Sequence, residues 1–465
     1  METVIFDREL LRRYDGPGPR YTSYPTAPQF TSSFGERDFR EHAARSNAEP
    51  IPRSLSLYVH IPYCQSPCFY CGCNRIITRD RGRGAPYVER LRREVSAVAP
   101  LFDRDREVLQ LHLGGGTPNF LTPEEIGDLL ETLGRRFMLT SRADRDFSIE
   151  LDPRHVAAGD IGTYAALGFS RASLGVQDFD PYVQSAINRE QSVEQTLAVI
   201  DDCRSSGFRS VNVDLIYGLP RQTPAGFACT LDTVLWARPD RLSIYGYAHM
   251  PRIFKAQNQI MEAELPDAGA KLALLQLAIE KLTIAGYRYV GMDHFALPGD
   301  DLSIARESSD LHRNFMGYTT HPACDLIGFG VSAISHIGDS FSQNPRELRP
   351  WEAAVDAGRP PVWRGMELDF DDLVRAEVIQ ALMCHAEIDI AQIEHRFEID
   401  FQLYFEDALS RLAPLIADGL VTIDEARITA TSRGRLLLRI IAMCFDKYLN
   451  GSQGVDARPR YSRVI

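Results

Sequence analysis

From Leu55 onward the sequence alternates short apolar, β-branched runs with longer amphipathic stretches, and this alternation limits the possible folds most. Such a pattern predicts strands followed by helices, and repeated strand–helix units favour parallel strands with right-handed crossovers. Because a closed barrel of this kind needs eight strands, we predict an α/β fold with an incomplete (β/α)6 TIM-like barrel, open along one side. The expected strands are SLYVHI (56–61), VLQLHL (108–113), FSIELD (147–152), RASLGVQ (171–177), SVNVDLIYG (210–218) and RLSIYGYA (241–248).

The pattern divides the 465 residues into three parts. Residues 1–50 are expected to be a loop-rich N-terminal arm, because the prolines and glycines of YDGPGPRYTSYP oppose helix formation. Residues 51–350 carry the partial barrel. Residues 365–450 predict a mostly helical C-terminal domain with one strand pair (LVTI and ITAT), which is typical of a winged-helix-like module. Acidic residues outnumber lysine and arginine there, so we expect a cap over a site rather than DNA binding.

Two helices can be bounded from the sequence. The stretch TPEEIGDLLETLGRRF (122–137) begins with Thr122, which can cap the helix, and Pro123, which suits its first position. Glu125 lies three residues after Thr122 and completes a capping box. A further helix is expected at 268–285.

Charge and hydropathy restrict the partners and the compartment. The net charge of -12 argues against broad nucleic-acid binding, which needs a basic surface. No segment is long and apolar enough to span a bilayer, and the N-terminus lacks the layout of a signal peptide. We therefore expect a soluble cytoplasmic protein. The nine cysteines do not predict a disulfide framework, because nine is odd and a cytoplasm is reducing.

Four of the cysteines, Cys64, Cys68, Cys71 and Cys73, follow the first expected strand with the spacing C-x3-C-x2-C-x-C. A zinc site usually takes a second Cys or Cys/His pair, and the sequence has no such pair elsewhere. A redox C-x-x-C formed by Cys68 and Cys71 would leave Cys64 unexplained. Three thiolates on one loop can instead hold a [4Fe–4S] cluster and leave one iron free for a substrate or cofactor.

This cysteine loop resembles that of the radical S-adenosylmethionine (SAM) enzymes. In those enzymes the free iron chelates SAM, and an electron from the cluster cleaves it to methionine and a 5′-deoxyadenosyl radical. The run Gly114–Pro118 (GGGTP) closes the second expected strand, at the end of a barrel where ligands bind. It resembles the methionine-binding element of these enzymes, and glycines there let the backbone approach a ligand closely.

Several further strings resemble one family within that class, the oxygen-independent coproporphyrinogen III oxidases. They are YDGPGPRYTSYPT, YVHIPYCQSPCFYCGCN, GVQDFD, INREQ, GMDHFA and HRNFMGYTT. The resemblance implies oxidative decarboxylation of two propionates of coproporphyrinogen III to vinyls, giving protoporphyrinogen IX in heme biosynthesis. It implies a [4Fe–4S] cluster, two SAM molecules and a reductant such as flavodoxin or ferredoxin. We expect a monomer.

The resemblance also assigns site residues. Those that correspond to cluster ligands are Cys64, Cys68 and Cys71. Those that correspond to contacts with the cluster-bound SAM are Tyr58, Gly115, Glu150 and Ile334. Those that correspond to contacts with the second SAM are Tyr70, Gly116, Thr117, Gln177, Arg189, Asp214 and Ala248. Cys73 is either a residue that tunes the cluster or acts near the substrate, or a buried thiol.

The residue pattern supports part of this set independently. Glu150, Gln177 and Asp214 stand at or near the C-terminal ends of successive expected strands, where a barrel has its reactive face. Glu150 and Asp214 could also serve as ion-pair partners or helix caps, and Asp152 before Pro153 is the better cap candidate. The propionates of the expected substrate need cationic partners. Candidates for that role, which are not among the assigned site residues, are Arg20, Arg75, Arg79, His312 and Arg313.

Two other functions are kept as alternatives. The first is a radical SAM heme chaperone or another tetrapyrrole-modifying enzyme, although Cys73 and the HRNFMGYTT block favour the oxidase. The second is a protein of a different class, an interaction module that a metal stabilises and that has no turnover. Iron and labile sulfide content would separate the second alternative from the others.

Overall fold

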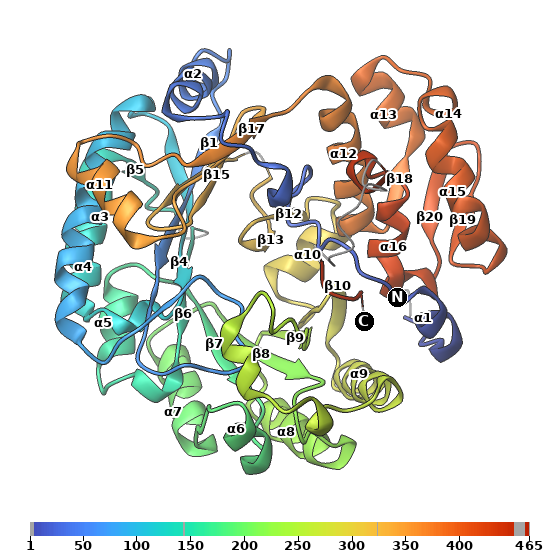
Figure 1. The fold of residues 1–465 in the computed structure, drawn as a ribbon, viewed down its shortest axis with the longest axis horizontal. Helices are drawn as coiled ribbons and strands as arrows, with labels where there is room; N and C mark the ends of the chain where they lie inside the picture. The colour runs from blue at the N-terminus through green and yellow to red at the C-terminus, as the bar shows by residue number, and fades with distance from the viewer. Residues whose placement is uncertain (1–3, 143–144, 323, 451–460, 465) are drawn as a thin grey trace.

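A single large sheet with mostly parallel strands organises the computed structural model, which describes residues 4–142, 145–322, 324–450 and 461–464 (Figure 1). All six predicted strands are confirmed. They are β1 (Ser54–Ile61), β4 (Glu107–Gly115), β6 (Asp146–Leu151), β7 (Arg171–Gln177), β8 (Ser210–Tyr217) and β9 (Arg241–Gly246). They pair in parallel in the order β9-β8-β7-β6-β4-β1.

The sheet extends beyond the predicted strands at both ends. A seventh parallel strand, β14 (Cys324–Phe329), pairs with β1 and was not predicted, because it follows turn-rich sequence. Antiparallel strands complete the edges: β10 (Arg288–Gly291) and β11 (His294–Ala296) beside β9, and β15 (Ile334–Ile337), β16 (Ser340–Gln343) and β17 (Arg364–Glu367) beside β14. In the described ranges β10 and β17 do not pair with each other, so the sheet is open.

Helices between the strands cover one face of the sheet and form an arc around it in Figure 1. They are α3 (Gly84–Val98), α4 (Pro123–Arg136), α5 (Asp160–Ala166), α6 (Pro181–Ala186), α7 (Val193–Ser205), α8 (Pro224–Ala237) and α9 (Ala268–Ile284). The predicted capping box of α4 is confirmed: the Glu125 amide donates to Thr122 Oγ1 at 3.2 Å, and the Thr122 amide donates to Glu125 Oε2 at 2.9 Å.

The two faces of the parallel strands differ in polarity. In β1 the side chains of Leu57, Val59 and Ile61 are fully buried in the core shared with the helices. The alternate residues point to the other face, as successive strand residues must. Across the sheet these alternate positions are polar, and they line internal cavities: Gln110, His112, Ser148, Glu150, Ser173, Asn212, Asp214, Ser243 and Tyr245. The inner face of the sheet is therefore available for a polar ligand.

The prediction of a loop-rich arm was wrong for two segments. Residues Arg8–Tyr14 form α1, whose N-cap Asp7 accepts hydrogen bonds from the amides of Glu9 and Leu10. Residues Glu36–Asn47 form α2, which buries Phe39, His42, Ala43 and Ser46. That spacing of i, i+3, i+4 and i+7 marks one helix face, but the neighbouring prolines and glycines obscured it.

The C-terminal part contains the predicted helices and strand pair. Its helices are α12 (Phe370–His385), α13 (Ile390–Phe397), α14 (Phe401–Tyr404), α15 (Glu406–Ala417), α16 (Leu438–Met443) and α17 (Lys447–Asn450). The predicted pair is β19 (Val421–Ile423) and β20 (Arg427–Ala430), and an unpredicted strand, β18 (Glu387–Asp389), adds to β20. Leu11, Tyr21 and Tyr24 of the arm belong to the core of this part.

Short elements connect these units. They are β2 (Tyr63–Cys64), β3 (Ile76–Ile77), β5 (Met138–Leu139), α10 (Asp301–Glu307), β12 (His312–Asn314), β13 (Gly317–Thr319) and α11 (Leu348–Asp356). None of the helices in the described ranges combines the length and apolar character that a membrane span requires.

Candidate active site

All but three of the predicted site residues line one cavity of about 280 Å³ on the inner face of the sheet. The cavity opens where β4, β6, β7 and β8 end, beside the loop that follows β1. The predicted residues in its wall are Cys64, Cys68, Tyr70, Cys71, Cys73, Gly115, Gly116, Thr117, Glu150, Gln177, Arg189 and Asp214. Residues spread over more than a hundred positions of sequence therefore share one space.

The cysteine loop is held at both ends by backbone pairing. β2 and β3 are parallel, with Tyr63 opposite Ile76, and the Thr78 amide donates to the Cys64 carbonyl at 2.9 Å. Below the loop, His60 Nε2 donates to the Asn74 carbonyl at 2.8 Å, while the His60 Nδ1 atom lies 3.0 Å from the Tyr58 hydroxyl. His60 thus fixes the loop rather than lining the cavity.

The glycine run lies directly against the base of the cysteine loop. Gly115 has a φ of +113°, and a Cβ atom there would lie 2.6 Å from the His60 ring. A Cβ atom at Gly116 would lie 2.6 Å from the Pro62 carbonyl oxygen. The positive φ of Gly115 disfavours a side chain there, and the close Pro62 carbonyl leaves no room for one at Gly116. A larger residue at either position would therefore displace the loop.

The donor set of the loop suits an iron–sulfur cluster. Cys64, Cys68 and Cys71 all face the cavity, and a cubane needs three thiolates around a common space, each on a different iron. Among the described residues no three His, Cys, Asp or Glu side chains are grouped closely enough for one metal ion. Hydrogen bonding from Cys73 lowers the pKa of the Cys71 thiol to about 6, which favours the thiolate.

Cys73 is exposed at the edge of the loop. Its amide donates to Cys71 Sγ at 3.4 Å, so its backbone supports the third ligand candidate. The Cys73 side chain lines the same cavity as the three ligand candidates, and its role stays a prediction.

Glu150 joins the glycine run to the inner face of the sheet. Its Oε2 accepts a hydrogen bond from the Gly115 amide at 3.1 Å, and its Oε1 lies 3.3 Å from His112 Nε2. Burial alone would raise the pKa of Glu150, but the hydrogen bond and charge of His112 and the Gly115 amide bring it below its usual value. Glu150 is therefore held as a carboxylate that faces the cavity.

Arg189 is a buried cation in the wall of the cavity. Its Nη1 lies 3.3 Å from Asp152 Oδ2 and 3.6 Å from Cys68 Sγ, and its Nε has no hydrogen-bond partner. Gln177 beside it has a φ of +72°, which is unusual for a residue with a side chain. Such strain is retained where the surroundings require it, and it directs Gln177 into the cavity wall.

Asp214 carries a carboxyl group at the inner end of the cavity. It accepts hydrogen bonds from Asn212 Nδ2 at 2.8 Å and from the Ser173 hydroxyl at 3.1 Å. Burial, together with the negative charge of Glu150, raises the pKa of Asp214 to about 6. The group can therefore change protonation state near neutral pH.

Sequence reasoning missed two charged residues of the wall. Asp152 does cap the turn after β6, as expected, because its Oδ1 accepts from the Arg154 amide at 3.1 Å. The same carboxylate also forms ion pairs with Arg154 at 2.7 Å and Arg189 at 3.3 Å, and both arginines approach Cys68. Burial opposes ionisation, but the two arginines hold the pKa of Asp152 well below its usual range. In the sequence, the position of Asp152 at the end of a strand, close to Glu150, could have indicated that it belongs to the site.

The three remaining predicted residues lie outside this cavity. Tyr58 is stacked on His112, with ring centroids 5.8 Å apart, underneath the glycine run. The backbone of Ile334 packs against Gly328 of β14, and Gly328 pairs with Tyr58 of β1. Ile334 therefore lies near Tyr58 rather than among the cysteines. Ala248 lines a neighbouring cavity. Gln257 Nε2 donates hydrogen bonds to the Ala248 carbonyl at 3.1 Å and to the Tyr70 carbonyl at 2.9 Å.

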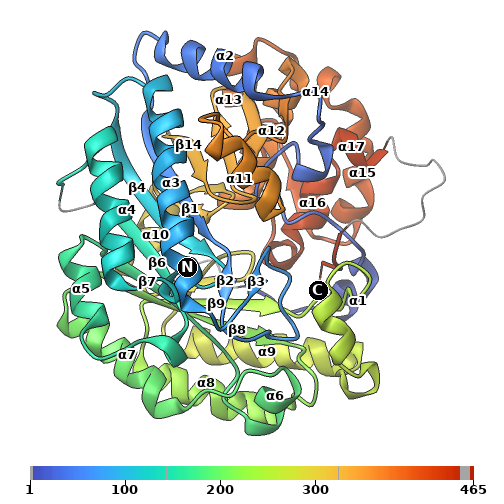
Figure 2. The same cartoon turned by 60° about the vertical axis from the view of Figure 1, so that its left-hand side comes forward.

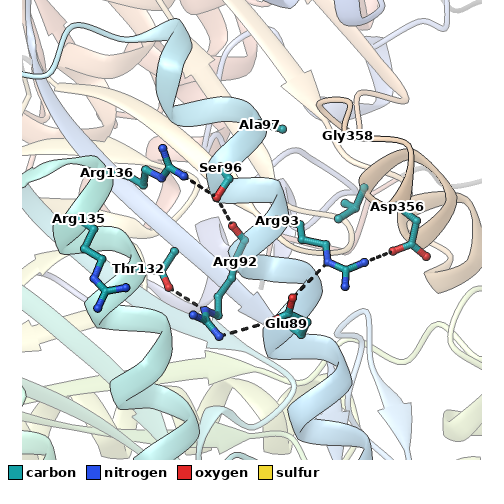
Figure 3. Close-up of a pocket in the computed structure, with 11 residues that line it drawn as sticks. Glu89, Arg92, Arg93, Ser96, Ala97, Thr132, Arg135, Arg136, Asp356 and Gly358 are labelled. Atoms are coloured by element: carbon teal, nitrogen blue, oxygen red, sulfur yellow. Dashed lines mark hydrogen bonds and ion pairs between the residues drawn. The ribbon is translucent and has the colours of Figure 1, made fainter.

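Another hollow lies on the outer side of the fold, between α3, α4 and α11 (Figure 3). Two of its arginines already have partners: Arg92 donates to Thr132 at 2.9 Å, and Arg93 donates to Glu89 and Asp356. None of its wall residues is among the predicted site residues. The inner cavity is therefore the better candidate for the active site.

The model of the Radical SAM superfamily matches residues 58–234, and the model described as the HemN C-terminal domain matches residues 368–437. With the mainly parallel sheet, the glycine run and the cysteine loop, these matches define a protein of the radical SAM class.

Two curated relatives described as "Oxygen-independent coproporphyrinogen III oxidase" align over their full lengths and that of this chain. The protein of Pseudomonas aeruginosa is 49% identical over 465 residues and that of Escherichia coli 46%. The solved structure described as "Coproporphyrinogen III oxidase (HemN) from Escherichia coli is a Radical SAM enzyme" matches with a TM-score of 0.91. It covers 96% of this chain and 100% of its own. The chain belongs to the family of oxygen-independent coproporphyrinogen III oxidases.

Proposed function

We propose that this protein converts coproporphyrinogen III to protoporphyrinogen IX by oxidative decarboxylation of two propionates without oxygen, as a step of heme biosynthesis. The observation that carries the proposal is the shared cavity of the three ligand cysteines, the glycine run and the carboxylates of Glu150 and Asp214. Full-length identity of 46–49% to relatives that bear this activity in their names supports it.

The protein's own residues bind and position the reactants in this proposal. Cys64, Cys68 and Cys71 hold the [4Fe–4S] cluster, and the Gly115 backbone lines the place for the methionine end of the cluster-bound SAM. The cluster and SAM, when bound, supply reductive cleavage to a radical that abstracts hydrogen from an unactivated propionate C–H bond. The position of the cavity on the inner face of the sheet limits the access of water to that radical, which is one contribution a protein makes to cofactor chemistry.

Two SAM molecules are the finer part of the proposal. Glu150 and Tyr58 belong to the cluster-bound molecule, with Ile334 behind Tyr58. Gln177, Arg189 and Asp214 belong to the second, with Tyr70, Gly116 and Thr117 on the same side and Ala248 beyond Tyr70. The unpartnered Nε of Arg189 supports this assignment, because a buried guanidinium group with a free donor suits a carboxylate ligand.

The organisation of the chain follows the same proposal. Residues 1–50 form the arm, 51–350 the radical SAM partial barrel and 365–450 a helical, winged-helix-like cap. The arc of helices around an open sheet of parallel strands supports the incomplete barrel. A flavodoxin or ferredoxin as reductant, a monomeric state and a cytoplasmic location stay predictions.

Anaerobic incubation of the reconstituted protein with coproporphyrinogen III, SAM and a reductant tests the function. We expect a product lighter by two molecules of carbon dioxide and four hydrogen atoms, together with methionine and 5′-deoxyadenosine. Replacing Cys64, Cys68 and Cys71 by Ser should abolish iron and sulfide binding, whereas Cys73→Ser should keep both and lower product formation. A cluster in the triple variant would contradict the ligand assignment, and cluster loss in Cys73→Ser would make Cys73 a ligand.

A further inference from the structure

A second cavity of about 480 Å³ lies beyond the ends of β8 and β9, next to the candidate active site. Besides the residues that end or follow β8 and β9, its walls include parts of the N-terminal arm, the helix α9 and the segment 461–464. The charged side chains in its wall are Arg20, Lys271, Arg463 and Asp293, with His249 beside them. Cations therefore outnumber carboxylates in the wall.

Lys271 is the cation of this cavity that lacks a counterion. Its Nζ donates to the Tyr247 carbonyl at 3.1 Å and lies 5.8 Å from the centroid of the Tyr217 ring. No carboxylate of the described ranges lies within ion-pair distance of it. Burial lowers the pKa of Lys271; the charges of Asp15 and Asp293 oppose that effect, while those of Arg20 and Arg463 add to it. A desolvated ammonium group without a partner is costly, and an anionic ligand would relieve that cost.

The other cations are placed around the same space. Arg20 pairs with Asp293 at 2.7 Å and lies 5.7 Å from the centroid of the Tyr245 ring. Arg463 at the rim pairs with Asp15 at 2.7 Å. Both pairs leave the charge of Lys271 uncompensated, so the cavity as a whole favours an anion.

The cavity adjoins the candidate active site, and its wall includes Ala248, a proposed contact of the second SAM. Tyr245 lines the cysteine-containing cavity, and Arg20 lies over the same ring. Gln257 joins Ala248 of the second cavity to Tyr70 of the first by hydrogen bonds of 3.1 Å and 2.9 Å. A molecule with several carboxylate arms can therefore place one arm in each cavity.

We propose that Lys271 and Arg20 form a carboxylate pocket that anchors one propionate of the tetrapyrrole substrate while another lies at the radical site. This inference rests on the proposed function for the identity of the ligand. The pocket distinguishes propionate-bearing tetrapyrroles from neutral molecules of similar size, and it determines which arm reaches the cofactor.

Lys271→Met tests the pocket because methionine keeps much of the volume and removes the charge. Coproporphyrinogen III is incubated anaerobically with the full-length, cluster-containing protein, the free fraction is separated by ultrafiltration, and it is oxidised to fluorescent coproporphyrin III for quantification. Loss of a charge-assisted hydrogen bond should raise the Kd about tenfold to a hundredfold. KM should rise similarly, with kcat at saturating substrate largely retained, while SAM binding by equilibrium dialysis stays unchanged. Lys271→Arg should restore most of the affinity.

Lys281→Met is the matched control. Lys281 belongs to the same helix and pairs with Asp232 of α8 at 2.5 Å, away from the cavity, so its removal should leave the Kd unchanged. Arg20→Gln is the second variant should Lys271→Met not fold, and it should weaken binding in the same direction. An unchanged Kd in the folded variants, or loss of SAM rather than tetrapyrrole, would overturn the pocket. Wild-type protein that neither binds nor converts coproporphyrinogen III would instead refute the proposed function.

Discussion

At the scale of single residues, buried charges define this site, and each has a partner that explains its state. Arg189 and Arg154 share Asp152, while Glu150 is held by His112 and the Gly115 amide. For Asp214, burial and the negative charge of Glu150 together raise the pKa. The wall therefore presents both a cation and carboxylates to a zwitterionic ligand such as an amino acid group.

Arg189→Ala should separate the two proposed SAM sites. Because the arginine contacts Asp152 and the cavity, its loss should weaken the second SAM by about 1.5–3 kcal/mol, a tenfold to hundredfold change in Kd. The cluster and its EPR response to the first SAM should persist, while decarboxylation is lost. Equilibrium dialysis measures the stoichiometry; two equivalents bound with wild-type affinity would return Arg189 to a structural role.

Glu94 makes stability depend on pH. It is fully buried in α3, and although Gly330, Asn344 and Trp351 donate hydrogen bonds to it, burial raises its pKa to about 8. A carboxyl whose pKa is higher in the folded state takes up a proton on folding, so its stabilising contribution is complete below about pH 4 and is lost as the pH rises towards 8.

Urea unfolding between pH 5 and 8 measures this effect. The free energy of unfolding of the wild type should fall relative to that of Glu94→Gln by up to about 1.4 kcal/mol per pH unit. Above pH 8 the difference should become constant. Parallel curves for the two proteins across the whole range would show that Glu94 does not titrate there.

At the scale of elements, alternation and capping chemistry were sufficient to predict six parallel strands and the start of α4. Elements without such a signal were missed: α2 lies between prolines and glycines, and β14 is a short apolar run after turn-rich sequence. The predicted site followed from strand ends and motif resemblance. The Asp152–Arg154–Arg189 network and the separation of Ala248 from the cysteines depend on side-chain packing, which spacing does not encode.

Thr122→Ala should weaken α4 at its first turn. The substitution removes the acceptor for the Glu125 amide and should lower the free energy of unfolding by about 1 kcal/mol, within a range of 0.5–2 kcal/mol. Thr233→Ala inside α8 is the control, because that threonine bonds a carbonyl of its own helix and caps nothing. Equal losses in both variants, measured by urea unfolding, would argue against the capping box.

At the scale of the whole molecule, the N-terminal arm connects the barrel to the C-terminal domain (Figure 2). Tyr21 donates to Asp446 at 2.9 Å, and Arg13 pairs with Asp418 at 2.7 Å. Arg439 of α16 is buried and donates to carbonyls of Gly18 and Pro19 in the arm and of Arg463 and Val464. The two terminal segments are thus fastened by one side chain.

Arg439→Met should loosen both segments together. Loss of charge-assisted hydrogen bonds worth about 1.5–3 kcal/mol should make opening of the arm tenfold to a hundredfold more frequent. Hydrogen exchange should therefore accelerate at residues 16–24 but not in β1 or β4. Arg396→Met, which removes an exposed arginine of α13 paired with Glu377, should leave the exchange of the arm as it is in the wild type.

The wall of the carboxylate pocket has a consequence for biosynthesis of the protein. Arg20 is translated more than four hundred residues before Arg463, and both contribute to that wall. At about 5–20 residues per second the ribosome needs roughly 20–90 s between them. A nascent barrel can thus form before its substrate pocket is complete, and any product that stops short of residue 461 would lack part of that wall while retaining every cysteine of the loop.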